Sequence, residues 1–406
     1  MNGFSVGDQP WLTAAATHAV MDALEAAGGP DCARFVGGSV RNAVLGQPVD
    51  DIDIATILTP DAVVAALKAA GLKSVPTGID HGTVTAISQR RPYEITTLRR
   101  DVTTDGRNAT VAFTTDWAED AARRDFRLNA LYADRTGRII DPTGAGLDDA
   151  LAGRIVFVGE AEMRIREDYL RILRFFRFYA WYGRGAPDGA AMAACSALKE
   201  GMVRLSAERV TKELLKLLAA TDPRDAVAAM QQAGVLERVL PGARAKGRFE
   251  ALCSLSDDAL LRLAALLEPG EDFGAATARL RLSNAEKDRL IGALGVEASL
   301  DMSDRQARAL IYRQSGGTVF DQIMLAWAAA PGRADGARRL LDLAAQWSPP
   351  PMPVGGADVR ALGLTPGPLT GQALKAFEAG WIADDFPTEG HAERLAAMVD
   401  ELRPRG

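Results

Sequence analysis

The chain has 406 residues and a net charge of −6, with 48% hydrophobic and 25% charged residues. These values are typical of a water-soluble globular protein of about two to four domains, without the overall positive charge of many nucleic-acid binders. No apolar run approaches the roughly 18 residues of a membrane span, and no secretory signal is visible, so we expect no membrane contact. Three distant cysteines without a CxxC spacing exclude a disulfide framework and a zinc site. We therefore expect a cytoplasmic location.

The N-terminal part predicts a mixture of strands and helices. Short β-branched segments bounded by turn residues occur here, namely ARFVGG, DIDIATI, TVTAIS, YEITTLR, VAFTT, RIIDPT and RIVFVG. Between them, DAVVAALKAAG predicts a helix that ends at Gly71. After residue 160, Ala/Leu/Arg-rich segments with a 3.6-residue spacing replace the strand signals. The predicted fold class is therefore α+β and multidomain, with an all-helical remainder.

The helical remainder divides at a proline-rich stretch. Residues 346–356 read QWSPPPMPVGG, and three consecutive prolines cannot continue a helix. Together with the change near residue 150, this stretch predicts a final small module. The expected segments are residues 1–150, 151–220, 221–346 and 347–406.

Acidic residues alternate with isoleucines in the second predicted strand. Side chains alternate between the two faces of a strand, so Asp51 and Asp53 share one face while Ile52 and Ile54 share the other. Two carboxylates together suit a hard cation such as Mg²⁺, which takes phosphate oxygens and waters as its other ligands. A polar strand edge is the simpler explanation of the pair taken alone.

A glycine turn precedes these acids. Gly37 and Gly38 follow the apolar strand ARFV, Ser39 is expected to cap the next helix, and Arg41 lies in its first turn. Backbone N–H groups at such a turn and a nearby arginine can hold phosphate groups. An ordinary strand-to-helix turn explains the glycines equally well, but the phosphate turn and the acidic pair together are more specific.

The segment RRDFRLNALYAD places Asp125 and Asn129 four residues apart, which predicts one helix face. Together they can hydrogen-bond a ribose, and Arg123 or Arg124 can reach a triphosphate. The alternative is a capped surface helix with an ion pair.

The segment EDYLRILRFFRF carries Asp168, Arg171 and Arg174 at a spacing of three residues, followed by Arg177. Cytosine and adenine both present an exocyclic amine beside a ring nitrogen acceptor. Asp168 can accept from that amine while the planar Arg171 donates to the ring nitrogen. The alternative is a packed helix whose arginines are solvated or pair with Glu167. Further along, Glu208 and Arg209 are expected to brace this helix.

Four motifs in this order resemble the class II tRNA nucleotidyltransferase and bacterial poly(A) polymerase family, within the DNA polymerase β-like nucleotidyltransferase superfamily. They are GGSVRNAVLG…DDIDIAT, RRDFRLNALYAD, EDYLRILRFFRF and LSAERVTKELLKLL. The tail GGADVRALGLTPGPLTGQALKAFEAGW is also similar to the family's C-terminal end. One departure is Asn42, where the family often has aspartate.

The resemblance implies a polymerase β-like head with a mixed sheet, a helical neck, a helical body and a tRNA-binding tail. It implies template-independent addition of CCA to the 3′ end of tRNA from CTP and ATP, with release of pyrophosphate and no stable protein partner. The expected catalytic and metal-binding residues, which would hold two Mg²⁺ ions, are Asp51 and Asp53. The expected nucleotide-binding residues are Gly37, Gly38, Ser39, Arg41, Arg124, Asp125, Asn129, Asp168, Arg171, Arg174 and Arg177. By resemblance, Asp168 and Arg171 are the protein template and Asp125 tests for the 2′-hydroxyl.

Two other functions stay open at this point. A poly(A) polymerase shares the head and template motifs, and a non-catalytic RNA-binding protein could retain the same fold. The sequence leaves open full CCA addition against A-only or C-only addition, and any role of Glu94 beside the metals. Residues 99–116 predict a polar loop over the site, and His81 is expected to be structural.

Overall fold

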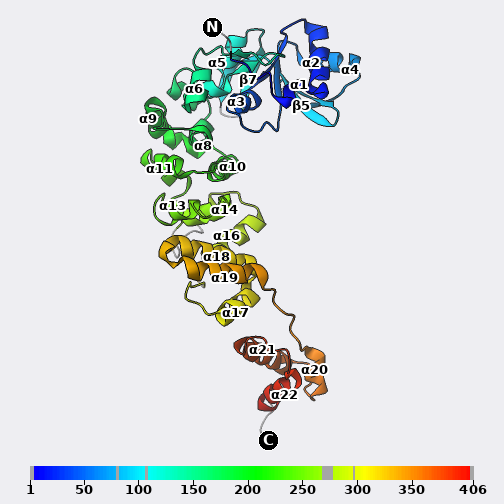
Figure 1. The fold of residues 1–406 in the computed structure, drawn as a ribbon, viewed down its shortest axis with the longest axis vertical. Helices are drawn as coiled ribbons and strands as arrows, with labels where there is room; N and C mark the ends of the chain where they lie inside the picture. The colour runs from blue at the N-terminus through cyan, green and yellow to red at the C-terminus, as the bar shows by residue number, and fades with distance from the viewer. Residues whose placement is uncertain (1–3, 79–81, 106–107, 268–277, 296–297, 403–406) are drawn as a thin grey trace. The chain divides into compact units, whose positions relative to one another are not determined.

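The computed structural model describes residues 4–78, 82–105, 108–267, 278–295 and 298–402, and it leaves the side chains of residues 101–111 undescribed. His81 lies outside the described residues. The chain forms two compact units, residues Met1–Ala243 with Ala278–Arg281 and residues Arg244–Thr277 with Leu282–Gly406. Strands occur in the first unit and helices dominate afterwards (Figure 1), which confirms the α+β class. The finer division into neck, body and tail stays a prediction.

The first unit contains a seven-stranded mixed sheet in the order β3-β4-β5-β2-β1-β8-β9. The mixed sheet is confirmed, since β2 and β5 are parallel and the other paired strands are antiparallel. Its strands are β1 (Ala33–Val36), β2 (Asp53–Thr56), β3 (Lys73–Gly78), β4 (Thr83–Ser88), β5 (Arg91–Thr97), β8 (Tyr132–Ala133) and β9 (Ile139–Ile140).

Burial along the strands follows their place in the sheet. The central strands β1 and β2 are mostly buried, and β4 alternates between buried and half-buried residues. Strand β3 lies at the edge, is largely exposed and contains Pro76, which lacks the N–H that a central strand would need. Strands β1 and β2, which lie on either side of the glycine turn in the sequence, are therefore buried near the centre of the sheet.

Helices α2 (Ala15–Gly28) and α4 (Pro60–Ala69) pack on each other and against the sheet. Trp11, in the short α1 (Pro10–Thr13), contacts Phe35 edge-to-face, with ring centroids 4.9 Å apart. The buried hydroxyls of Thr17 and Tyr93 lie 3.0 Å apart and join α2 to β5. These contacts cover the sheet with apolar groups and satisfy the buried hydroxyls.

The loop predicted over residues 99–116 is wrong. Strands β6 (Arg99–Asp105) and β7 (Asn108–Phe113) pair antiparallel in a separate two-stranded sheet. The polar, glycine-containing sequence suggested a loop, but cross-strand backbone bonds need no apolar pattern. The strand predicted at RIVFVG is reduced to one bridge, between Phe157 and Phe126.

The remaining described helices of the first unit lead from the sheet into the neck region. They are α3 (Gly38–Val44), α5 (Trp117–Ala122), η2 (Arg127–Asn129), α6 (Gly146–Ala152), α7 (Ala161–Glu167), α8 (Leu170–Tyr182), α9 (Gly189–Leu198), η3 (Lys199–Arg204), α10 (Ala207–Leu218), α11 (Arg224–Gln232) and α12 (Val235–Val239).

Helix α8 carries the arginines of the third motif. Its Leu, Ile and Phe side chains are buried, and it packs against α10 and α11 (Figure 1). The strongly amphipathic α10 buries Leu214, Leu217 and Leu218. The apolar face of α8 is thus fixed, and its arginines are held on the opposite side.

Among its described residues, the second unit contains helices and the connections between them, without strands. Its helices are α13 (Arg248–Cys253), α14 (Ala259–Leu266), α16 (Asn284–Leu294), α17 (Asp304–Gln314), α18 (Gly316–Ala329), η4 (Pro331–Arg333), α19 (Ala334–Gln346), α20 (Gly356–Ala361), α21 (Pro368–Ala383) and α22 (His391–Leu402). Capping boxes begin α16 at Ser283 and α17 at Ser303.

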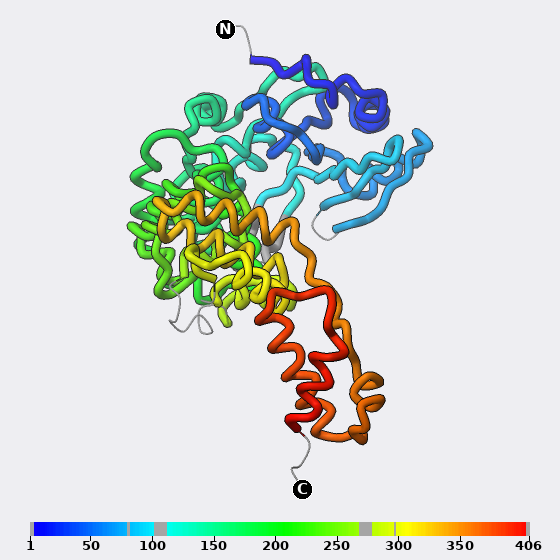
Figure 2. The backbone as a smooth tube through the Cα atoms, turned by 60° about the horizontal axis from the view of Figure 1, so that its bottom comes forward, coloured from blue at the N-terminus to red at the C-terminus, as the bar shows by residue number. Residues whose placement is uncertain are grey.

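The proline stretch interrupts the helices, as expected, between α19 and α20. Trp347, Met352 and Val354 of this stretch pack against the apolar core of α20, α21 and α22, the last three helices (Figure 2, orange to red). In the part of the chain that the structure describes, every helix is too short or too polar to cross a membrane.

Candidate active site

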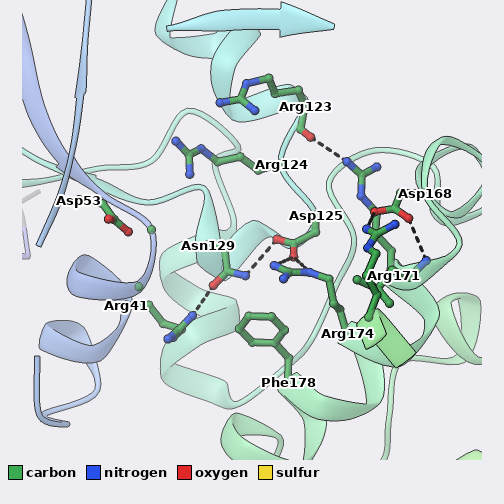
Figure 3. A pocket seen from close by; sticks show the side chains of 14 residues that line it. Arg41, Asp53, Arg123, Arg124, Asp125, Asn129, Asp168, Arg171, Arg174 and Phe178 are labelled. Carbon is green, nitrogen blue, oxygen red and sulfur yellow. Dashed lines mark hydrogen bonds and ion pairs between the residues drawn. The ribbon is translucent and has the colours of Figure 1, made fainter. Parts of the chain in front are cut away.

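A cavity of about 410 Å³ in the first unit brings together residues of all four motifs, the fourth through Arg209. In Figure 3, Asp53 lies on one side, Asp168 and Arg171 lie on the opposite side, and Arg124 and Asn129 lie between them. The predicted residues that line it are Gly37, Gly38, Arg41, Asp53, Arg124, Asp125, Asn129, Asp168, Arg171 and Arg174. Ser39, Asp51 and Arg177 do not line it, whereas Arg123, Leu170, Phe178 and Arg209 do.

The glycine turn at the start of α3 lies beside two arginines. Gly37 has φ +71° and ψ −125°, a conformation that is accessible essentially to glycine alone. A Cβ atom at Gly37 would lie 3.7 Å from Nη1 of Arg124, and one at Gly38 would lie 3.7 Å from Nη2 of Arg41. Arginines from two motifs therefore converge on this turn.

Ser39 does not cap α3, so that prediction is wrong. The helix begins one residue earlier, at Gly38, with Gly37 in the capping position. The Ser39 side chain is buried, and its hydroxyl donates to the carbonyl of Val36 at 3.1 Å. Its role in this structure is to join the end of β1 to the turn.

The predicted alternation is present at Ile52, Asp53 and Ile54, but Asp51 does not share the cavity lining with Asp53. Ile52 and Ile54 are 2% and 0% exposed, Asp53 begins β2 and faces the cavity, and Asp51 precedes the strand and is exposed. Glu94 on β5 pairs in register with Asp53. Burial, with the charges of Glu94 and Asp51, raises the pKa of Asp53 to about 6.

Burial first, and then the nearby carboxylates of Glu94 and Asp51, make the charged form of Asp53 costly, and a divalent ion would offset this cost, so the oxygen donors fit such an ion. Within the described residues, no three His, Cys, Asp or Glu side chains are grouped to hold a metal by themselves.

Asp125 and Asn129 meet, but not on the helix that their spacing predicted. Helix α5 ends at Ala122, and Asn129 ends the short 3₁₀ turn η2. The Asn129 amide still donates to Oδ1 of Asp125 at 3.0 Å. Burial would raise the pKa of Asp125, but Arg174 and Asn129 lower it to about 2. The helix prediction is wrong because the chain turns to bury Phe126 completely.

Asp125 belongs to a polar chain that joins α3 to α8 (Figure 3). Arg41 donates to Asn129 at 2.6 Å, Asn129 donates to Asp125, and Nε of Arg174 donates to Asp125 at 2.8 Å. We call Arg41, Asn129, Asp125 and Arg174 the polar chain. It connects the glycine turn to the helix that carries Arg171.

Asp120 is a buried carboxylate with three donor partners, and it was not among the residues predicted from the sequence. Its carboxylate accepts from Arg123 at 2.9 Å, from Arg124 at 2.9 Å and from the Tyr132 hydroxyl at 2.7 Å. Burial would raise its pKa, but Arg124, Arg123 and Tyr132 lower it to about 2. The signal was present, because Asp120 precedes the two arginines by three and four residues, the spacing at which side chains meet on a helix such as α5.

Asp168 and Arg171 lie at a break between α7 and α8, where Asp168 has a non-helical φ of −154°. Oδ2 of Asp168 accepts from Arg209 at 2.6 Å, so the prediction that Arg209 braces this region is confirmed. Glu208 instead pairs with Arg281 at 3.5 Å. Arg171 donates to the carbonyls of Arg164 and Arg123 at 2.9 and 3.2 Å and also pairs with Glu167.

Arg177 points away from the cavity lining and pairs with Glu213 at 2.6 Å. Its guanidinium lies 4.4 Å from the centre of the Phe178 ring. Phe178 and Tyr182, one turn apart on α8, were not predicted from the sequence, and their ring centres lie 5.2 and 4.2 Å from the guanidinium of Arg41. Arg177 therefore contacts Phe178 of the cavity lining without lining the cavity itself.

Comparisons with known proteins agree with this geometry. Residues 33–156 match the poly A polymerase head domain family, and residues 187–246 match a probable RNA and SrmB-binding site of polymerase A. The chain is 33% identical over 377 residues to CCA tRNA nucleotidyltransferase 1, mitochondrial, of Homo sapiens, covering 88% of this chain and 84% of that protein. It is 40% identical over 245 residues to the CCA-adding enzyme of Streptococcus sanguinis, covering 59% and 58%.

A crystal structure of the Bacillus stearothermophilus CCA-adding enzyme in complex with CTP has a TM-score of 0.76 and 26% identity to this chain. It covers 97% of this chain and 98% of that one. The mixed sheet, the acidic strand and the arginine-lined cavity define a nucleotidyltransferase. The chain belongs to the CCA tRNA nucleotidyltransferase and poly(A) polymerase family.

The hydrogen bonds and ion pairs of Asp120 predict that the free energy of unfolding depends on pH. Because its pKa is about 2 in the folded protein and about 3.9 in the unfolded chain, Asp120 stabilises fully above pH 4 and loses this effect as the pH falls toward 2. D120N should lower the free energy of unfolding at pH 7 by at least about 2 kcal/mol. Urea unfolding from pH 7 to pH 2.5 measures this.

The exposed D148N is the matched control and should leave stability nearly unchanged. The difference in the free energy of unfolding between D120N and the wild type should become smaller as the pH falls. If this difference in the free energy of unfolding is the same at pH 7 and pH 2.5, the ionised carboxylate of Asp120 does not have the proposed role.

Proposed function

We propose that this protein completes the 3′-CCA end of tRNA, using CTP and then ATP and releasing pyrophosphate. The observation that carries the proposal is the single cavity that Asp53, the glycine turn and the Asp168–Arg171 pair all line. The named activity of relatives covering most of this chain supports it. A cytoplasmic location stays a prediction.

Asp53, with Asp51 beside it, is proposed to bind two Mg²⁺ ions. Both carboxylates offer hard oxygen ligands, and a cation would offset the burial and the nearby negative charges that raise the pKa of Asp53. The chemistry that bound Mg²⁺ supplies is activation of the RNA 3′-hydroxyl and neutralisation of charge on the leaving pyrophosphate. Glu94 adds negative charge next to Asp53 without lining the cavity.

The triphosphate is proposed to lie over Gly37 and Gly38. The guanidinium groups of Arg41 and Arg124 flank this turn, and both line the cavity. Arg124 is held there by Asp120, so its position is fixed before the ligand arrives. This arrangement neutralises the developing charge with groups that need no reorganisation.

The ribose is proposed to contact Asn129 and not Asp125. A carboxylate has about four lone-pair sites. Those of Asp125 are used by the backbone N–H of Phe126, the amide of Asn129 and two nitrogens of Arg174. Asn129 keeps one N–H and one lone pair. Asp125 then acts by holding Asn129 and Arg174 in place.

Asp168 and Arg171 are proposed to read the base edge, with Arg174 and Arg177 orienting the pair. Arg209 and the backbone carbonyls of Arg164 and Arg123 hold the two side chains from behind. A base with an amine beside a ring acceptor satisfies both groups, whereas uracil and guanine leave them unpaired.

Residues 151–220, 221–346 and 347–406 are proposed as neck, body and tail, with the tail binding tRNA. In the second unit, a cavity of about 720 Å³ lies between α17 and α21. Arg305 and Arg313 line it, and such side chains suit RNA phosphates.

The deciding experiment incubates the purified protein with Mg²⁺ and tRNA lacking CCA, and supplies CTP and ATP separately and together. Addition of two C and then one A is the expected result. A long A ladder on any RNA would instead identify a poly(A) polymerase, and no turnover would leave an RNA-binding protein.

D53N tests the acidic pair. Loss of a charged oxygen at the metal site should lower the rate of nucleotide addition by at least about 10³-fold, since such groups contribute several kcal/mol to the transition state. The measurement is single-turnover addition of C to tRNA. D50N removes the neighbouring exposed charge and should retain most activity. Normal turnover by D53N would refute the assignment.

R171A tests the base-reading pair. Removing the donor should lower the ratio of CTP to UTP incorporation by about 10- to 100-fold, because one bidentate contact is worth about 1–3 kcal/mol of discrimination. Competition between the two nucleotides on one tRNA measures the ratio. R166A changes an exposed arginine of α7 and is the control. Unchanged discrimination in R171A would place base recognition elsewhere.

A further inference from the structure

Asn42, on α3, lies between two groups with opposite hydrogen-bonding needs. Its Oδ1 accepts from Nε and Nη2 of Arg41 at 3.1 and 2.9 Å, and its Nδ2 donates to the carbonyl of Pro48 at 2.8 Å. A guanidinium only donates and a proline carbonyl only accepts, so the orientation of the amide is fixed. Aspartate could serve the first contact but not the second.

Arg41 is buried among neutral partners. Its side chain also donates to Asn129 at 2.6 Å and to the Tyr182 hydroxyl at 2.8 Å, with the Tyr182 ring centre 4.2 Å away. Arg41 is only 8% exposed. In the described part of the chain it belongs to no ion pair, and Asp125, the carboxylate that acts on it from further away, is already paired with Arg174. A buried guanidinium without a carboxylate costs stability, which is tolerated where an anion is to be bound.

One N–H of Arg41 remains for a ligand. A guanidinium has five N–H groups. Four hydrogen bonds go to Asn42, Asn129 and Tyr182, which leaves one N–H of Nη1 without a partner among the described residues. Arg41 lines the cavity, with Gly38 beside its other terminal nitrogen. The charge of Arg41 therefore lies at the cavity wall, beside the proposed triphosphate site.

We propose that Asn42 is a positioning residue that fixes Arg41 toward the cavity with a neutral oxygen, so that the charge of Arg41 stays available to the triphosphate. This inference rests on the proposed function, because it assumes a nucleoside triphosphate beside Gly37 and Gly38. A carboxylate at position 42 would hold Arg41 equally well but would neutralise it. Removal of the Asn42 side chain would leave Arg41 charged but would no longer hold it in position.

Two variants separate these effects. N42D keeps the acceptor and adds a negative charge, whereas N42A removes the acceptor without adding charge. The measurements are KM for CTP and ATP, kcat, and the inhibition constant of inorganic tripolyphosphate, each at two salt concentrations. Tripolyphosphate probes the phosphate site without the base.

N42D should raise KM for both nucleotides and the tripolyphosphate constant by about tenfold, which is the effect of losing one charge-assisted contact. The salt dependence of both constants should become weaker, because an attractive charge is neutralised. N42A should raise the same constants by only about two- to fivefold and keep the salt dependence. KM for tRNA should not change in either variant. N284D adds the same charge at an exposed position of the second unit and should match the wild type.

If N42D has the wild-type KM for both nucleotides and the wild-type inhibition constant for tripolyphosphate, the inference is overturned. Equal losses of melting temperature and kcat in both variants without a change in KM would also overturn it, since that pattern indicates a purely structural residue. If N42D does not fold, Y182F removes another neutral acceptor from Arg41 and should raise the tripolyphosphate constant about two- to threefold. An unchanged constant in Y182F would then contradict the inference. A wild-type protein that does not incorporate CTP would refute the proposed function instead.

Discussion

The site depends on one buried carboxylate, that of Asp125. It lies between the sheet-bearing part of the first unit and helix α8, where burial alone would raise its pKa. Arg174 from α8 and Asn129 from η2 supply the donors that keep it ionised. Through Asn129 the same chain of bonds reaches Arg41 on α3. The proposed base-reading residues and the glycine turn therefore line one cavity, whose two sides are joined through this carboxylate.

Charge is distributed along the cavity in a way that suits a nucleotide. Asp53, with Asp51 and Glu94, concentrates negative charge at one end, where a cation lowers the repulsion. The arginines between the two ends divide into those whose charge is neutralised by the protein, such as Arg174, and Arg41, whose partners are neutral. The paired arginines fix geometry, whereas Arg41, which has no ion pair among the described residues, is proposed to attract the anionic ligand. A template for bases made of side chains is possible because Asp168 and Arg171 are held from behind by fixed partners.

Local patterns predicted the residues whose placement depends on neighbours in sequence. The alternation of Asp53 with Ile52 and Ile54 is confirmed by their burial, and the mixed sheet followed from the motifs. The helix expected through Asp125 failed because the burial of Phe126 outweighs a weak local preference for helix. Tyr182 could not be predicted, because it meets Arg41 141 positions away in the chain. The strand predicted at VAFTT overlaps β7, but its pairing with β6 was missed because that pairing rests on backbone bonds without an apolar pattern.

The central claim is that one nucleotide spans this cavity, with its triphosphate at the glycine turn and its base at the pair on α8. A crystal structure of the protein with Mg²⁺ and an unreactive CTP analogue tests this most directly. The account predicts phosphate oxygens beside Gly37, Gly38 and Arg41, and the amine and ring nitrogen of cytosine at Asp168 and Arg171. A base bound away from Asp168 and Arg171, with the phosphates still at the turn, would contradict it.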